Sequence, residues 1–319
     1  MKWESAKDEQ ILLTARDLIR LACDGNPPPV WDPFCGGGSI PLEAQRLGIV
    51  AYASDLNPVA VIVTKALIEI APKFAGRPPV NPQDRAKLGG TSRWKGAAGL
   101  AADVRYYGTW LRNEAERRIG RWYPNSELPG GGEATTLAWL WARTVRCPNP
   151  ACGAQMPLTS KWTLSTKPGK PVWVEPKIDR SFSPPSVQFE LQTRAGEVPP
   201  GTVNRKGANC VACGMAVPFD HVRAEGQAGR MGSQMLAMVA DGPSGRTYLP
   251  ADPAHVAVAA SAVPSWKPDA VLPHNPRDFK TPNYGMRTFG DLFTPRQLLV
   301  LTTFADILGE ARDGTCQPC

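Results

Sequence analysis

The sequence predicts an α/β fold organised around a parallel sheet, and three observations support this. A glycine-rich loop separates a short apolar strand from a helix, which lets the backbone approach a ligand closely. A second strand ends in an acidic residue about twenty residues beyond the glycines. Two pairs of closely spaced cysteines further along predict a metal-binding insertion. Strand, helix and strand at short spacing favour a right-handed parallel crossover.

The N-terminal part begins with a helix and a strand. Apolar residues recur at helical spacing over residues 5–23, and Val30–Trp31 then forms the end of a buried strand with Asp32 at its tip. The glycines follow, and Ser39 is a candidate N-cap for a helix that reaches Leu47. The unpaired N–H groups at the start of that helix would face a polar or anionic group of a ligand.

A second strand and a second helix complete the predicted repeat. The strand, residues 49–54, leads to Asp55, whose carboxylate is placed to bind ribose hydroxyls. Asn57 opens a helix that reaches about Ile70 and is apolar on most sides, so we expect it to be buried. A connection rich in proline and glycine follows as far as Gly99.

The middle of the chain predicts a long helix and a strand. The amphipathic helix covers residues 100–122 and carries Glu114 and Arg118 as an i,i+4 pair on its solvent side. A strand over residues 138–146 then leads into the first cysteine pair.

The last part of the chain predicts short strands, a loop and a final helix. A helix is expected around Met231–Met238, and a proline-rich surface loop over residues 252–283. Thr294 and Gln297 form a capping-box pattern at the start of a helix that ends near Ala311. We therefore expect three parts. Residues 1–135 form the ligand-binding half, residues 136–250 the cysteine-bearing insertion, and residues 251–319 a linker and helix that return to the first part.

Composition indicates a globular protein with a basic surface. Hydrophobic residues make up 42% of the chain, the formal charge is +7 and the pI is about 9.0. A basic balance favours polyanionic partners but is also common on ordinary soluble surfaces. The sequence shows neither the apolar region of a signal peptide nor an apolar run long enough to span a membrane. We expect a cytoplasmic protein with reduced cysteines and no membrane partner.

Four of the eight cysteines form two knuckles. Cys147 pairs with Cys152 and Cys210 with Cys213, and a glycine follows each pair directly. The turn of each knuckle directs both thiolates towards one ion, and glycine tolerates the positive φ that follows the turn. Together they predict a closed, tetrahedral and therefore structural Zn²⁺ site. We expect His221 to face solvent instead of replacing one ligand.

The other cysteines predict no second metal site. Cys316 and Cys319 share a Cys-x-x-Cys spacing but have no partner pair nearby, so we interpret them as part of an unstructured tail. Cys23 and Cys35 are expected to be small buried residues, with Cys35 close to the ligand of the glycine loop.

The loop Asp-Pro-Phe-Cys-Gly-Gly-Gly-Ser lacks the lysine of a phosphate-binding P-loop and the spacing of a nicotinamide loop. It matches the Asp-Pro-Phe-x-Gly-x-Gly-[Ser/Thr] pattern with which amino-group DNA methyltransferases hold S-adenosylmethionine. With the first knuckle and residues 222–232 and 289–298, it resembles the zinc-ribbon-containing adenine-specific DNA methylase family. The resemblance implies a Rossmann-like methyltransferase core with a zinc-ribbon insertion, S-adenosylmethionine and Zn²⁺ as cofactors, and transfer of a methyl group to adenine N6 in DNA.

The resemblance also implies which residues hold the cofactor. Asp32 and Gly36 to Gly38 would contact its methionine part, and Asp55 its ribose. The full set of cofactor residues expected from the loop and the second strand is Asp32, Pro33, Phe34, Cys35, Gly36, Gly37, Gly38, Ser39, Asp55 and Asn57.

The catalytic residues of such an enzyme are not found in this sequence. The family uses [Asp/Asn]-Pro-Pro-[Tyr/Phe], whose first residue accepts a hydrogen bond from the target amine and whose ring stacks on the flipped base. The nearest matches, residues 26–29 and 183–186, lack the aromatic residue. We therefore expect the central portion of a longer or split enzyme, whose second chain would carry the motif. The alternatives are a non-catalytic, zinc-dependent nucleic-acid-binding module and a methyltransferase whose substrate is RNA.

Overall fold

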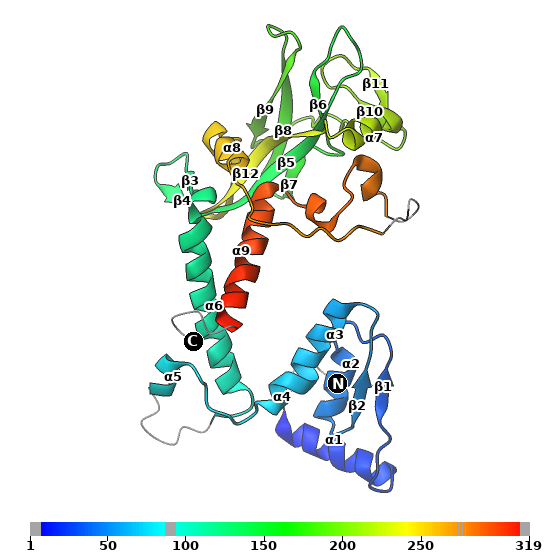
Figure 1. Cartoon of the computed structure of the whole chain (residues 1–319), viewed down its shortest axis with the longest axis vertical. Helices are drawn as coiled ribbons and strands as arrows, with labels where there is room; N and C mark the ends of the chain where they lie inside the picture. Colours follow the sequence, from blue (N-terminus) through cyan, green and yellow to red (C-terminus); the bar gives the residue numbers. More distant parts are fainter. Residues whose placement is uncertain (1–7, 87–93, 274, 276, 278, 313–319) are drawn as a thin grey trace. The chain divides into compact units, whose positions relative to one another are not determined.

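The computed structural model describes residues 8–86, 94–273, 275, 277 and 279–312. They form two compact units, one up to Arg112 and the other from Asn113 onward. The division falls within the long helix α6 (Ala98–Ile119). Figure 1 shows the elements of both units.

The first unit contains a parallel pair of strands joined through a helix. β1 (Val30–Asp32) pairs with β2 (Ala51–Ala53), with Val30 opposite Ala51, and α2 (Ser39–Arg46) connects them and contacts both. The first helix, α1, covers Glu9–Ala22. Its N-cap is Asp8, whose carboxylate accepts hydrogen bonds from the next turn, while the predicted start at residue 5 lies outside the described part of the chain.

The prediction that the second apolar helix is buried is wrong. This helix is α3, and Thr64 is its one buried residue, whereas Val59 is 64% exposed and Ile62 67% exposed. The described sheet of this unit has two strands, and so small a sheet cannot cover a helix that is apolar on most sides. The helical segments between the second strand and the long helix are α3 (Pro58–Lys65), a π-helical turn (Ala66–Ile70), α4 (Ala71–Lys73) and α5 (Pro82–Ala86).

The second unit is built mainly from antiparallel strands. One sheet has the order β13-β12-β5-β6 and another the order β7-β8-β9, and two strand pairs, β3–β4 and β10–β11, stand apart. The strands are β3 (Ser126–Glu127), β4 (Glu133–Ala134), β5 (Thr136–Arg146), β6 (Gln155–Leu158), β7 (Thr163–Lys167), β8 (Lys170–Asp179), β9 (Ser186–Gln192), β10 (Gly207–Asn209), β11 (Ala216–Pro218), β12 (Gly232–Gly242) and β13 (Gly245–Pro250).

A shared core joins the two larger sheets. Trp162 and Val174 come from the segment around β7 and β8, and they pack with Ala142 of β5 and with Leu236 and Ala237 of β12. Trp162 is fully enclosed, and its ring nitrogen donates to the carbonyl oxygen of Pro200 over 3.1 Å. The two sheets are therefore fixed to each other by a packed apolar layer.

The helix predicted around Met231–Met238 is wrong, because this segment is the strand β12. It lies between β5 and β13, and all residues from Met235 to Ala240 are buried. A central strand that is covered on both faces loses the alternation of apolar and polar residues. A run of methionine, leucine, alanine and valine then cannot be told from a buried helix by its periodicity.

One helix of this unit differs from the prediction, and the start of another confirms it. The proline-rich stretch after residue 251 contains a helix, α8, because Asp252 accepts a hydrogen bond of 2.7 Å from the N–H of Ala254 and so caps it. The capping box at Thr294 and Gln297 is confirmed by hydrogen bonds between the two residues in both directions. The helical segments are a 3₁₀ turn (Gly120–Trp122), α7 (Phe219–Gln227), α8 (Pro253–Ala260), two 3₁₀ turns (Thr281–Tyr284 and Phe289–Leu292) and α9 (Pro295–Arg312).

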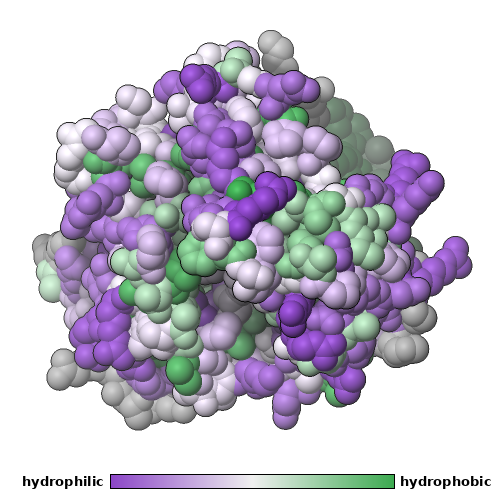
Figure 2. All heavy atoms as spheres, turned by 90° about the horizontal axis from the view of Figure 1, so that it is seen from above, coloured by the Kyte–Doolittle hydropathy of each residue, from purple (hydrophilic) through white to green (hydrophobic). Residues whose placement is uncertain are grey.

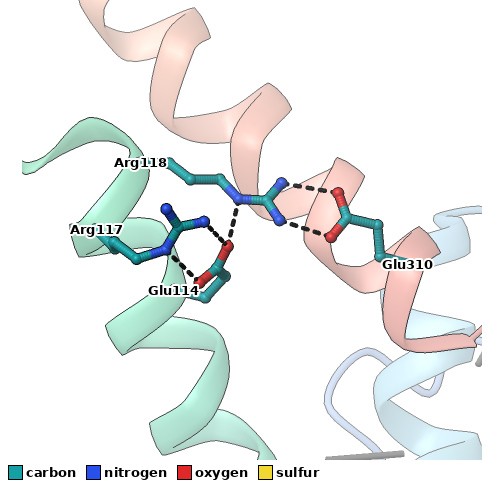
Figure 3. A network of polar contacts seen from close by, with 4 residues as sticks. All are labelled: Glu114, Arg117, Arg118 and Glu310. Carbon is teal, nitrogen blue, oxygen red and sulfur yellow. Dashed lines mark hydrogen bonds and ion pairs between the residues drawn. The ribbon is translucent and has the colours of Figure 1, made fainter. Parts of the chain in front are cut away.

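A network of charged side chains joins the end of α6 to α9. Arg118 donates to Glu114 on its own helix over 2.7 Å and binds Glu310 of α9 through two hydrogen bonds of 2.6 and 2.7 Å (Figure 3). Arg117 also donates to Glu114, over 2.6 and 2.9 Å. The pair of Glu114 and Arg118 was expected on a solvent face, but it belongs to a contact between helices.

The outer surface is mixed. Hydrophilic residues cover much of the face shown in Figure 2, and apolar patches lie between them. No helix in the described part of the chain is both long and apolar enough to span a bilayer.

The charged network predicts a stability that depends on pH. Hydrogen bonds from Arg117 and Arg118 lower the pKa of Glu114 from 4.5 to about 2. A carboxyl with a depressed pKa stabilises the fold above its unfolded pKa and loses this contribution as the pH falls from about 5 to 2. The free energy of unfolding should therefore fall less steeply over this window in Glu114→Gln than in the wild type, measured by urea unfolding. Glu116→Gln is exposed on the same helix and should keep the wild-type slope; an equal effect of both variants would contradict the prediction.

Candidate functional site

Four cysteines come together at the turns of two strand pairs. Cys147 directly follows β5 and Cys152 precedes β6, while Cys210 follows β10 and Cys213 lies in the turn before β11. Their sulfur atoms all lie within 4.8 Å of one another. These four cysteines, called the cysteine cluster below, could bind a metal ion, as the spacing predicts.

The distances within the cysteine cluster fit a tetrahedral ion. Cys147 Sγ lies 3.7 Å from Cys213 Sγ, and Cys152 Sγ lies 3.8 Å from Cys210 Sγ. Four sulfurs that bind zinc at about 2.3 Å in a tetrahedron are about 3.8 Å apart. Each close pair joins one knuckle to the other, so the cluster connects two segments that are remote in sequence.

Backbone turns hold both knuckles in place. Cys152 and Gly153 donate their N–H groups to the carbonyl oxygen of Asn149, and Gly214 donates to that of Cys210. Gly153 and Gly214 have φ of 59° and 75°, the left-handed region that favours glycine. The first knuckle has two more residues between its cysteines than the second, and these residues form the turn at Asn149.

Two residues that support the cysteine cluster were missed by the sequence reasoning. Asn149 Nδ2 lies 3.7 Å from Cys213 Sγ and so reaches from the first knuckle to the second. Arg180 donates to the carbonyl oxygen of Ala212 over 2.9 Å. The position of Asn149 inside the first knuckle was the available signal for it, whereas nothing in the sequence links Arg180 to the second. Outer groups of this kind orient the ligands of a metal.

His221 does not belong to the cysteine cluster. His221 Nε2 lies 2.9 Å from the carbonyl oxygen of Arg146, to which it donates in the tautomer protonated at Nε2. Cys147, Cys152 and Cys210 lie in an apolar core whose other members include Val145, Met156 and Val217, whereas Cys213 is exposed. The four cysteines are therefore the ligand set that the described residues offer.

The surroundings set the protonation of these thiols. Burial raises the pKa of Cys147 and of Cys210, whereas the N–H of Met215 donates to Cys213 and helps to lower its pKa to about 7. Metal ligands must be thiolates, so binding of an ion would release protons from the buried cysteines. The affinity for a metal should therefore decrease as the pH is lowered.

The glycine loop and the acidic tip of the second strand also meet. Asp55 Oδ2 accepts a hydrogen bond of 2.9 Å from the N–H of Gly36, and Asp55 Oδ1 accepts one of 2.8 Å from the N–H of Asn57. These two hydrogen bonds lower the pKa of Asp55 and keep it ionised, and the bond from Asn57 has the larger effect. A fixed carboxylate thus lies at the carboxyl edge of the parallel strands, directly beside the loop.

One glycine of the loop is required by packing. Gly38 has a φ of 78°, and a Cβ at this position would lie 2.8 Å from Thr64 Oγ1 and 3.2 Å from Thr64 Cα. Gly36 and Gly37 have open space where a Cβ would be. The loop therefore packs against α3 at Gly38 and keeps its backbone accessible at the two preceding residues.

The remaining residues of the predicted cofactor set have different environments. Asp32 accepts a hydrogen bond from the N–H of Phe34, a residue that is 81% exposed, and Pro33 lies between them. Cys35 is buried against Thr64, as expected. The predicted N-cap at Ser39 is wrong, because Gly38 takes that position in the left-handed conformation and Ser39 is the first helical residue.

Asn57 has a structural role in the second helix. Its side chain accepts from the N–H of Val59 over 3.0 Å and caps α3. A cavity of about 370 Å³ lies between β2 and α3, and Cys35 is the one member of the predicted cofactor set that lines it. This cavity is therefore separate from the exposed backbone of the loop.

Comparison of the chain with models of known protein families, with curated proteins and with solved structures finds no match.

The cysteine cluster predicts one bound zinc ion per chain. Cys152→Ser should reduce the zinc content to near zero, because one hard hydroxyl replaces a buried thiolate. It should also lower the midpoint of thermal unfolding by about 10 °C or more, since a structural ion contributes several kcal/mol. Zinc content is measured by elemental analysis of purified protein. Cys23→Ser removes a cysteine outside the cluster and should retain full zinc; retention of zinc by Cys152→Ser would refute the site.

Proposed function

We propose that this chain binds S-adenosylmethionine at the glycine loop and is the cofactor-binding, zinc-bearing portion of an adenine-N6 DNA methyltransferase. The observation that carries the proposal is the hydrogen bond of 2.9 Å between the N–H of Gly36 and Asp55. It joins the tips of two parallel strands at the edge where doubly wound α/β folds bind nucleoside cofactors. The Asp-Pro-Phe-x-Gly-x-Gly-Ser pattern makes S-adenosylmethionine the preferred cofactor.

The loop residues would divide the cofactor between them. Gly36 and Gly37 have no Cβ to hinder a ligand, and Asp55 keeps lone pairs for ribose hydroxyls after its two backbone bonds. Asp32 would contact the methionine part. The bound cofactor would supply a methyl group on a sulfonium centre, and the protein would bind and orient it towards the target amine.

The second unit would contribute to DNA binding. The cysteine cluster, filled by structural Zn²⁺, would stabilise the insertion, and the net charge of +7 favours a polyanionic partner. Because the sequence has no [Asp/Asn]-Pro-Pro-[Tyr/Phe] motif, a second chain would supply the catalytic residues. The partners are therefore DNA and a chain that carries this motif.

A second function is favoured by one observation, namely that the cysteine cluster and its apolar core lie wholly in the second unit. A zinc-stabilised unit of this kind would bind nucleic acid without a cofactor. Tight DNA binding that S-adenosylmethionine does not change, together with no binding of the cofactor, would favour this module over the methyltransferase.

The cofactor proposal predicts a specific loss of binding at Asp55. Asp55→Asn should weaken S-adenosylmethionine binding by about 10- to 100-fold, because an amide offers one oxygen where the carboxylate accepts two backbone hydrogen bonds. Isothermal titration calorimetry measures the affinity. Glu43→Gln changes an exposed carboxylate on α2 and should bind like the wild type. Equal affinity of Asp55→Asn and the wild type would remove the main support for the cofactor site.

The missing motif predicts that the purified chain alone forms no N6-methyladenine in duplex DNA. Incubation with labelled S-adenosylmethionine and detection of labelled adenine by mass spectrometry test this directly. A product formed by the 319 residues alone would show that catalytic residues other than the expected motif are present. Activity restored by a second chain carrying the motif would support a split enzyme.

A further inference from the structure

We propose that a cleft between two hairpin tips of the second unit binds the phosphodiester backbone of DNA. The cleft has a volume of about 850 Å³ and is lined by the turn between β7 and β8, the turn between β12 and β13, and Thr193 after β9. Its three charged lining residues are Lys167, Lys170 and Arg246, and no acidic residue lines it. This proposal rests on DNA being the substrate in the proposed function.

The two lysines form a pair that costs stability. Lys167 and Lys170 are Cα partners that close the β7–β8 hairpin, and the turn between them is Pro168–Gly169 with a φ of 72° at the glycine. Like charges directly opposite each other on adjacent strands are destabilising. Both side chains are exposed, and no ion pair relieves either of them within the part of the chain that the structure describes. A bound anion would relieve this repulsion.

The third cation is fixed relative to the lysines. Arg246 lies on β13, and Tyr248 two residues later donates to the carbonyl oxygen of Leu164 on β7 over 3.3 Å. The second hairpin is thereby tied to the first. Asp241 is the cross-strand neighbour of Arg246, yet no ion pair within 4.0 Å joins them among the described residues. Arg246 is therefore not held in an ion pair among the described residues, although the carboxylate of Asp241 lies on the neighbouring strand.

The polar side chains of the cleft suit phosphate oxygens. The hydroxyls of Thr166, Thr193 and Ser244 line it and form no hydrogen bond within the described residues. Hydroxyl and cationic donors are the groups that bind a nucleic-acid backbone, whereas base recognition needs side chains that read base edges. The cleft thus matches a sugar–phosphate strand of any sequence.

A second basic cleft, beside the cysteine cluster, is a weaker candidate. It contains Arg146, His221 and Arg230, but Arg230 binds Glu225, which also lines that cleft, over 2.6 Å. The internal carboxylate offsets the positive charge there. The cleft between the hairpins has no such carboxylate on its wall.

Salt dependence of DNA binding tests the proposal. The triple variant K167Q/K170Q/R246Q and the wild type are titrated against a fluorescent duplex from 50 to 200 mM salt. If the three cations each neutralise one phosphate, the slope of log K against log salt becomes shallower by about 2.7 in the variant. A single-stranded probe distinguishes binding of one strand from binding of a duplex, because each neutralised phosphate contributes about 0.7 to the slope for a single strand and about 0.9 for a duplex. The midpoint of thermal unfolding of the variant should equal or exceed that of the wild type, because the opposed lysines are gone.

Two controls make the outcome specific. R205Q/K206Q removes exposed cations outside the cleft and should keep the wild-type slope, and K167R/K170R preserves the charge and should do the same. Equal slopes for the triple variant and the wild type, or no DNA binding by the wild type at 50 mM salt, would overturn the proposal. Binding of S-adenosylmethionine is measured on the same samples and does not involve the cleft. If the wild type does not bind S-adenosylmethionine, the result counts against the methyltransferase proposal and not against the cleft.

Discussion

The second unit depends on the joining of two knuckles that are 58 to 66 residues apart in sequence. The sheet β7-β8-β9 lies wholly between Cys152 and Cys210, so the cysteine cluster closes the ends of the segment that forms it. A metal ion bound by the cluster would link the ends of this long segment and so reduce the entropy of the unfolded chain. The hairpin tip with Lys167 and Lys170 belongs to a segment whose two ends meet at the cluster, and Trp162 of this segment packs into the core shared with β5 and β12.

The first unit is governed by a smaller constraint. Two three-residue strands bury little apolar surface, and the glycine loop is held by polar contacts with Ser54, Asp55 and Thr64. Most apolar residues of α3 remain exposed. The glycine loop therefore has little apolar packing around it.

Local signals predicted much of this structure, and long-range pairing explains most of the errors. The cysteine knuckles and the Thr294 capping box follow from short patterns whose chemistry acts within a few residues, and both are found. The strand β12 was mistaken for a helix because its two neighbours bury it on both faces. Asp252 starts a helix inside a proline-rich stretch that looked like a loop. The cleft between the hairpins was not predictable, because Lys167 and Arg246 are 79 positions apart and meet only through folding.

Net charge alone could not say where an anion would bind. Many cations of this chain are already satisfied: Arg118 binds Glu114 and Glu310, and Arg230 binds Glu225. An ion pair of this kind has little charge left to attract a phosphate, since the carboxylate cancels it at short range. Opposed lysines without a carboxylate retain theirs and repel each other, so the same feature that weakens the free hairpin strengthens its interaction with an anion. The positive charges that can attract an anion are thus those of side chains that form no ion pair.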